Sequence, residues 1–112
     1  MAQIIVFFQK PTTLVEGTFY SDPFDISAFK SLTTQVMFME GQGTSPTVTG
    51  QIQQSSDLNT WSDSGSTLAP TEGNVSTQTQ SDLARYVRLK VTIGGSSSPA
   101  ATIWAKAVAR EN

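Results

Sequence analysis

A chain of 112 residues with a formal net charge of -2 is long enough for one domain and has no basic excess to attract nucleic acid. It contains no Cys and no His, which removes disulfides, thiol chemistry, the commonest general base and the commonest zinc ligand. We therefore predict a single domain over residues 1–112 that is not an enzyme, needs no cofactor or metal and binds no nucleic acid.

The first predicted strands lie near the N-terminus, where residues 3–9 are apolar on both faces and residues 14–20 form a second extended run. Pro23 ends the pairing of this second strand. The apolar run of residues 4–8 is far too short to span a bilayer, so no membrane association is expected. Residues 1–10 are predicted to be an interface strand or arm.

A long strand is predicted over residues 32–40, where side chains alternate between two faces. One face carries Leu32, Val36 and Phe38, and the other carries Met37 and Met39. The Gly and Pro content of residues 41–46 predicts a loop, and residues 47–54 follow as a further strand.

The second half of the chain continues the alternation. Residues 75–80 (VSTQTQ) are almost entirely polar, which is typical of an edge strand or a ligand-facing surface rather than a central strand. Residues 84–93 place Val87, Leu89, Val91 and Ile93 on one face, residues 94–99 form a flexible loop, and residues 101–109 close the domain. About eight strands with frequent turns predict an all-β fold, an antiparallel, jelly-roll-like β-sandwich.

The most specific local motif is the polar turn that ends at Trp61. The Asp57 carboxylate is suited to accept hydrogen bonds from backbone N–H groups two residues on, and Asn59 tolerates a left-handed backbone. Trp61 is then placed to fold back over the base of the turn. We interpret these three residues as structural.

The chain has more apolar side chains than one thin core needs. Surfaces that are apolar on a second side usually mark an interface, although long loops that cover them would explain the same pattern. The residues expected to make contacts with other subunits are Ile4, Ile5, Phe7, Phe8, Met37, Met39 and Trp104.

The order of four segments carries a family resemblance over residues 22–110. They are PFDISAFKSL (23–32), QQSSDLNTW (53–61), ARYVRLKVT (84–92) and IWAKAV (103–108). In this order they resemble the small β-sandwich modules of tailed-bacteriophage structural proteins, including head decoration or cement proteins.

This resemblance implies a non-enzymatic virion protein that binds the outer capsid surface and stabilises the shell. Its partners are then the major capsid protein or other virion subunits, and it associates with itself, as a homotrimer in the first instance and a dimer in the second.

The same sandwich pattern also resembles discoidin-like and carbohydrate-binding modules. On that alternative the chain is a carbohydrate-binding module of a phage tail or a secreted protein, with Trp61 and Trp104 as the aromatic residues that contact sugar. Residues 75–80 offer no aromatic platform for this alternative.

Overall fold

The computed structural model describes residues 2–111, apart from the side chains of Lys10 and Pro11. Met1 and Asn112, the two ends of the predicted domain, lie outside this range. None of the described residues forms a helix long and apolar enough to cross a bilayer. In this range seven strands form and every pairing is antiparallel. They are β1 (Ala2–Val15), β2 (Gly17–Tyr20), β3 (Phe24–Asp25), β4 (Ser31–Ser55), β5 (Ser62–Leu68), β6 (Asn74–Ser81) and β7 (Tyr86–Arg110).

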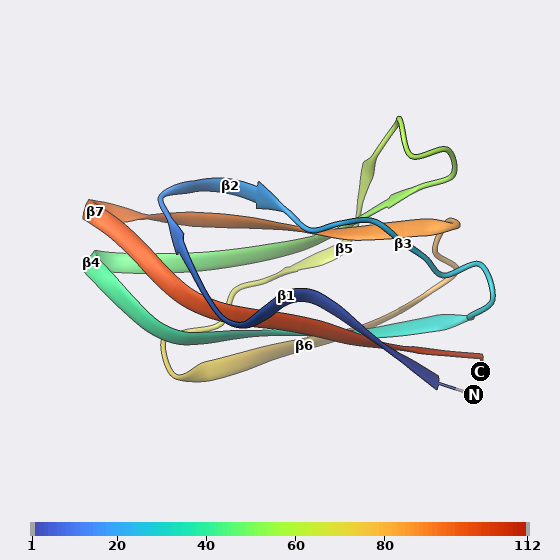
Figure 1. Cartoon of the computed structure of the whole chain (residues 1–112), viewed down its shortest axis with the longest axis horizontal. Coiled ribbons are helices and arrows are strands. Elements are labelled where there is room, and N and C mark those ends of the chain that lie inside the picture. Colours follow the sequence, from blue (N-terminus) through green and yellow to red (C-terminus); the bar gives the residue numbers. More distant parts are fainter. Residues whose placement is uncertain (1, 112) are drawn as a thin grey trace.

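The scaffold is a single ladder between β4 and β7, each 25 residues long. It runs from Ser31 opposite Arg110 to Ser55 opposite Tyr86. Both strands turn at the left end of Figure 1, so the ladder folds back over itself. The first half of β4 and the second half of β7 lie with β1 and β6 in a lower layer. The other halves lie with β2, β3 and β5 in an upper layer, which completes the predicted jelly-roll-like sandwich.

The predicted loops at residues 41–46 and 94–99 are bends inside β4 and β7 rather than loops. One rung of the ladder persists there, with Thr44 opposite Ser96, and register shifts flank it. The backbone turns at Gly43, whose φ is 86°. Glycine adopts this positive φ readily because it has no Cβ. Each long strand therefore joins two predicted strands, which leaves seven strands where the sequence predicts about eight.

The core lies between the two layers and follows the predicted alternation. On β7 the buried side chains come from every second residue, while Tyr86, Arg88, Lys90 and Thr92 face outward and are half-buried. The same holds on β4, where Met37 and Met39 lie on the outer face. The fully buried large side chains include Leu32, Val36, Phe38, Val48, Ile52, Val87, Leu89, Val91, Ile93 and Ile103.

The polar strand β6 is an edge strand, as its sequence predicts, because it pairs with β4 alone. Its alternate glutamines reach across to β5 in the other layer. The Gln80 Nε2 donates to Ser64 Oγ at 2.9 Å, and the Gln78 Nε2 donates to the Ser66 carbonyl at 2.8 Å. Polar side chains thus close this side of the sandwich.

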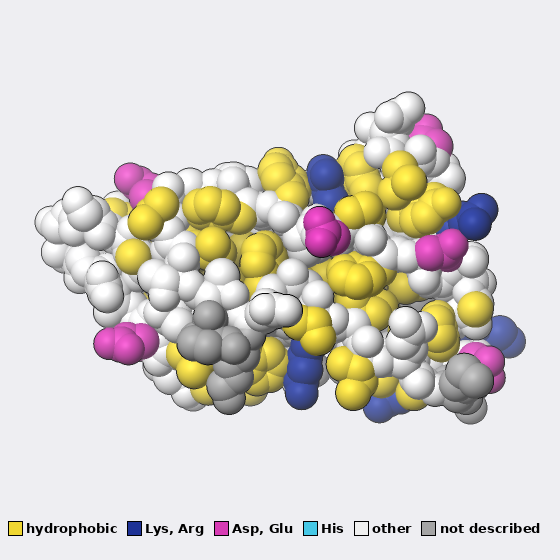
Figure 2. All heavy atoms as spheres, in the orientation of Figure 1, with side chains coloured by type: hydrophobic (Ala, Val, Ile, Leu, Met, Phe, Trp, Pro, Cys, Tyr) yellow, Lys and Arg dark blue, Asp and Glu magenta, His cyan; other side chains and the backbone are white. Residues whose placement is uncertain are grey.

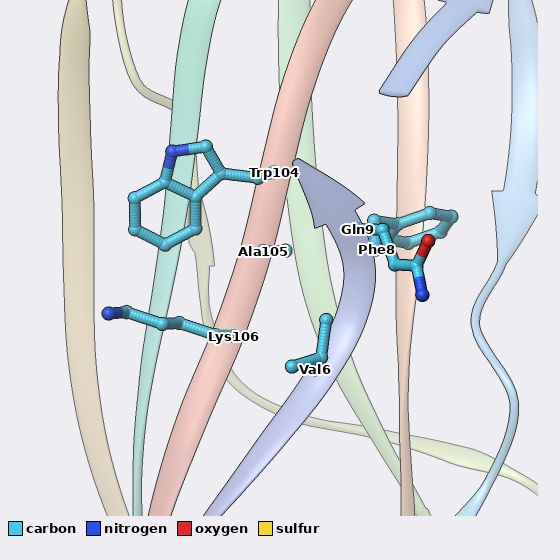
Figure 3. A pocket seen from close by; sticks show the side chains of 6 residues that line it. All are labelled: Val6, Phe8, Gln9, Trp104, Ala105 and Lys106. Carbon is cyan, nitrogen blue, oxygen red and sulfur yellow. The ribbon is translucent and has the colours of Figure 1, made fainter. Parts of the chain in front are cut away.

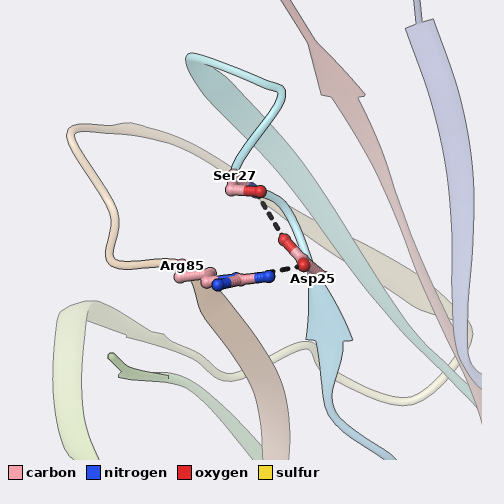
Figure 4. Close-up of polar contacts among 3 residues, drawn as sticks. All are labelled: Asp25, Ser27 and Arg85. Carbon is pink, nitrogen blue, oxygen red and sulfur yellow. Dashed lines mark hydrogen bonds and ion pairs between the residues drawn. The ribbon is translucent and has the colours of Figure 1, made fainter. Parts of the chain in front are cut away.

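The opposite side is held where β3 meets the start of β7. The Asp25 carboxylate accepts a hydrogen bond from the Ser27 N–H at 2.9 Å and another from the Arg85 Nε at 3.2 Å (Figure 4). The Ile26 N–H also donates to the Arg85 carbonyl at 2.8 Å. Because the Asp25–Arg85 pair is exposed, its role is to orient the chain more than to stabilise it.

The bend in β4 generates the first prediction. Gly43 (φ 86°) and Gly73 (φ 84°) share one backbone conformation but differ in the space around them. A Cβ on Gly73 meets nothing within 4 Å, whereas a Cβ on Gly43 would lie 2.8 Å from the Ser96 carbonyl oxygen. Gly73→Ala should therefore cost only the left-handed strain, about 1–2 kcal/mol of unfolding free energy. Gly43→Ala should cost roughly 1–3 kcal/mol more, from the added clash.

Chemical denaturation of both variants measures this difference. Equal loss of stability in the two variants would show that the bend tolerates a side chain and that the ladder does not depend on the close approach at Gly43.

Candidate interaction surface

The N-terminal strand divides its apolar side chains between the core and the surface. Ile5 and Phe7 are buried, with 3% and 7% of their surface exposed, and Phe7 packs edge-on against Phe24 with ring centroids 5.7 Å apart. Ile4 and Val6 point outward and are 68% and 49% exposed. Ile5 and Phe7 are therefore core residues of their own chain, and not the exposed contact residues that their place in an apolar run leads us to expect.

The N-terminal segment is also not a separate arm. β1 pairs with β7 from Ala2 opposite Arg110 to Val15 opposite Ala100, with irregularities between Val6 and Thr12. It is the outermost strand of the lower layer, so the description of residues 1–10 as a strand applies to the described part of that range.

The other residues expected at an interface lie on or near the outer face of the lower layer. Trp104 on β7 is directly opposite Met37 on β4, and Met37 is directly opposite Val75 on β6. Trp104, Met37 and Met39 are half-buried and Val75 is 48% exposed. We call Trp104, Met37 and Val75 the apolar row. Sequence reasoning missed Val75 because it stands at the start of an otherwise polar strand.

A shallow groove lies beside the apolar row, next to the irregularity in β1. Its volume is about 450 Å³, and its walls are Val6, Phe8, Gln9, Trp104, Ala105 and Lys106. In Figure 3, Trp104 and Lys106 project from β7 next to one another, with the Lys106 Nζ 5.0 Å from the centroid of the Trp104 ring. Phe8 is partly buried and packs against the core, so only part of it lines the groove.

This surface offers apolar contact and one ammonium group rather than reactive chemistry. None of the described residues that line the groove is Asp or Glu. Within residues 2–111 no three carboxylates gather closely enough to hold a metal ion. Such a surface is suited to bind a partner by packing, with Lys106 as the group that would favour an acidic neighbour.

The turn at residues 55–61 lies apart from this surface, at the end of the β4–β5 hairpin (Figure 1). The Asp57 carboxylate accepts hydrogen bonds from the N–H groups of Asn59 and Thr60, both at 2.9 Å, as the sequence predicts. The left-handed residue is Leu58, with φ of 67°, rather than Asn59. A leucine holds this conformation because the Ser55 hydroxyl accepts the Leu58 N–H at 2.9 Å.

The Trp61 ring packs against Arg88, which points outward from β7 in the upper layer. The guanidinium of Arg88 lies 4.3 Å from the centroid of the Trp61 ring and 4.3 Å from that of Tyr20. Its Nε donates to the Gln53 Oε1 at 2.8 Å, and the Gln53 Nε2 donates to Asp63 at 2.9 Å. A cation between two rings in this way pins the hairpin to β7 and β2.

The hydrogen bonds around two carboxylates lower their pKa values. The backbone N–H groups of Thr60 and Asn59 lower the pKa of Asp57, and the Ser55 hydroxyl adds to this effect. The Ser27 N–H lowers the pKa of Asp25, with further help from the Ser27 hydroxyl and from Arg85. In both turns the fold favours the ionised carboxylate.

No protein-family model and no curated protein matches this sequence. Solved structures match it in fold. The PBSX exported protein XepA aligns with a TM-score of 0.71 and 13% identity, over 100% of this chain and 37% of that chain. The SPBc2 prophage-derived protein YomS aligns with a TM-score of 0.61 and 11% identity, over 97% and 92%. The VP2 subviral particle of infectious bursal disease virus gives 0.61 and 11%, over 99% and 33%.

At these identities the likeness shows the fold alone. The chain spans about a third of the length of the XepA and VP2 chains, at 37% and 33%. It therefore has the β-sandwich fold found in prophage-derived proteins and in viral jelly-roll proteins.

The lowered pKa of Asp57 predicts a pH-dependent contribution to stability. A depressed folded pKa stabilises the fold above the ordinary carboxyl pKa, and this contribution is lost as the pH falls through the lower folded pKa. Asp57→Asn should therefore lower the thermal midpoint near neutral pH, and the gap from the unsubstituted protein should close as the pH falls through the lowered pKa of Asp57.

Thermal unfolding followed by circular dichroism across this pH range measures the gap. Asp22→Asn is the matched control, because it removes one carboxylate in the same way but from the segment between β2 and β3, outside the turn at residues 55–61. A gap of constant size from neutral to acid pH would contradict the assigned role of the Asp57 charge.

Proposed function

We propose that this chain is a non-enzymatic structural subunit of a phage or virus-like particle, bound to the outer surface of the shell as a decoration or cement protein. The observation that carries the proposal is the apolar row on the outer face of the lower layer. Trp104, Met37 and Val75 stand side by side on three paired strands, on the face that points away from the chain's own core.

The composition of this face supports a protein partner. Interface centres are enriched in aromatic residues and Met, and their rims are polar. Here the row of one Trp, one Met and one Val is bordered by Thr77 on β6 and by Gln35 and Lys106 in the next row of the sheet. The partner that suits it is a major capsid protein or another virion subunit with a complementary apolar patch and an acidic group for Lys106.

The fold supports the same role. The sandwich is held together by the folded ladder and by buried aliphatic side chains. The chain has no Cys, so no disulfide contributes to this stability. A small domain of this kind adds a rigid block to a shell at little cost in chain entropy. The particle structures that share the fold, and the prophage-derived ones, are consistent with this position on a virion surface.

Introducing a charge into the apolar row tests the proposal. Val75→Lys places an ammonium group at the end of the row, at a side chain 48% exposed. Leu58→Lys is the matched control, because Leu58 is 45% exposed but lies on the β4–β5 hairpin. We expect Val75→Lys to weaken binding to particles stripped of this protein by about tenfold or more, which equals about 1.4 kcal/mol, and Leu58→Lys to leave it unchanged.

Co-sedimentation with the stripped particles measures both affinities, and thermal unfolding checks that both variants fold. Equal particle binding by the two variants and the unsubstituted chain would remove this face from the proposal.

Carbohydrate binding is the second candidate, and the Tyr20–Arg88–Trp61 cluster is the observation that favours it. Tyr20 is 50% exposed and stands beside a guanidinium and an amide, a combination that suits sugar hydroxyls. Against it, Arg88 already occupies one face of the Trp61 ring. Saturable binding on a glycan array that is lost in Tyr20→Ala would promote this candidate over the first.

A further inference from the structure

The outer edge of β1 has no partner strand in the described chain, because β1 lies at the end of the strand order and pairs with β7 alone. Natural sheet edges are usually protected by charges, by Pro, by short length or by β-bulges. β1 is 14 residues long, with a register shift between Val6 and Phe8. Residues 2–9 (AQIIVFFQ) contain neither a charge nor a Pro, and they run along the front of the lower layer in Figure 1. Figure 2 shows hydrophobic side chains gathered on the same face of the molecule.

The other edges of the sandwich do not share these properties. β2 and β3 are only 4 and 2 residues long. β6 (NVSTQTQS) is polar, and its glutamines are bonded to β5. β5 (SDSGSTL) carries an Asp and a Gly, both of which disfavour strand addition. The β1 edge is therefore the one suited to accept another strand.

The sequence of this edge is complementary to itself. Residues 3–9 read Gln-Ile-Ile-Val-Phe-Phe-Gln, so an antiparallel pairing centred on Val6 places Gln3 opposite Gln9. It also places the inward Ile5 opposite the inward Phe7 of the other copy. Aromatic and β-branched residues directly opposite one another contribute about 0.2–1 kcal/mol per pair.

We propose that β1 is a self-association site at which a second copy of this chain adds its own β1 in antiparallel orientation across a two-fold axis at Val6. The pairing joins the two lower layers into one continuous sheet. It gives a dimer, rather than the homotrimer that the family resemblance favours. The proposal does not depend on the proposed function, because the apolar row remains uncovered in the pair.

The charges near the β1 edge also allow a second copy of the chain to pair there. Lys106 is directly opposite Val6 on β7, one strand in from the edge. In the pair, the two Lys106 positions are separated by three strand spacings, about 14 Å. This exceeds the screening length of about 8–10 Å at ordinary ionic strength, so their repulsion is weak. Lys10 and Pro11 follow directly after the paired segment in the sequence, and a charge and a Pro at these positions would limit the pairing to residues 3–9 on both sides of the two-fold axis.

The mass of the purified chain in solution tests the proposal without any particle present. Sedimentation over a range of concentrations should show a reversible dimer, of twice 12.0 kDa. Val6→Lys should raise the dissociation constant by about tenfold or more, since it sets two ammonium groups opposite each other at the axis. Val15→Lys, at a side chain 63% exposed but outside residues 3–9, should leave it unchanged.

A crosslink gives a second readout that needs no change of charge. The chain has no Cys, so Val6→Cys introduces a single thiol at the axis. Residues directly opposite in an antiparallel pair have Cα atoms about 4.5–5.5 Å apart, within the range for a disulfide. Mild oxidation should convert Val6→Cys to a covalent dimer, and Val15→Cys should stay uncrosslinked.

A monomer at all concentrations, a trimer, or a dimer that Val6→Lys does not weaken and Val6→Cys does not crosslink would each overturn the proposal. None of these results bears on particle binding, which is measured separately through Val75.

Discussion

Every element of this fold depends on one long ladder that doubles back on itself. β4 and β7 remain paired from end to end, and the bend lets the same two strands line both layers. Their alternate side chains then meet in the middle, where Leu32, Val36, Leu89 and Ile103 lose all exposure to water. The other strands are additions to this ladder, since each one pairs directly with β4 or β7. The bend at Gly43 is thus as important to the core as the apolar residues.

The alternation within each half of the ladder could be predicted from the sequence, because side chains in a strand point to opposite faces in turn. This is why Val87 to Ile93 were placed correctly without a structure. The continuity of the ladder could not be predicted. Gly and Pro at residues 41–46 and 94–99 indicate a change of direction, but only the partner strand decides whether pairing survives it. Each segment by itself therefore indicates a bend, but neither indicates that the two strands stay paired through it.

The candidate surface was predicted only in part, for a related reason. Residues 4–8 are apolar on both faces, so the pattern could not say which face of β1 lies inward. The structure places Ile5 and Phe7 inward, which leaves Ile4 and Val6 at the surface. The row from Trp104 through Met37 to Val75 depends on the register of three strands distant in sequence. The placement of Arg88 between Tyr20 and Trp61 likewise needs a fold before it can be seen.

The two proposed surfaces belong to the same layer, and β1 is the strand next to the β7 segment that carries Trp104. Its edge would pair with a second copy, while Val6 and Phe8 line the groove beside Trp104. A two-fold axis normal to the sheet keeps both outer faces on the same side, so a pair presents two apolar rows to one particle surface. Two weak contacts held together in this way bind more tightly than either alone, because the second contact forms within an already bound pair. If both proposals hold, a surface as small as one apolar row is enough for attachment to a particle.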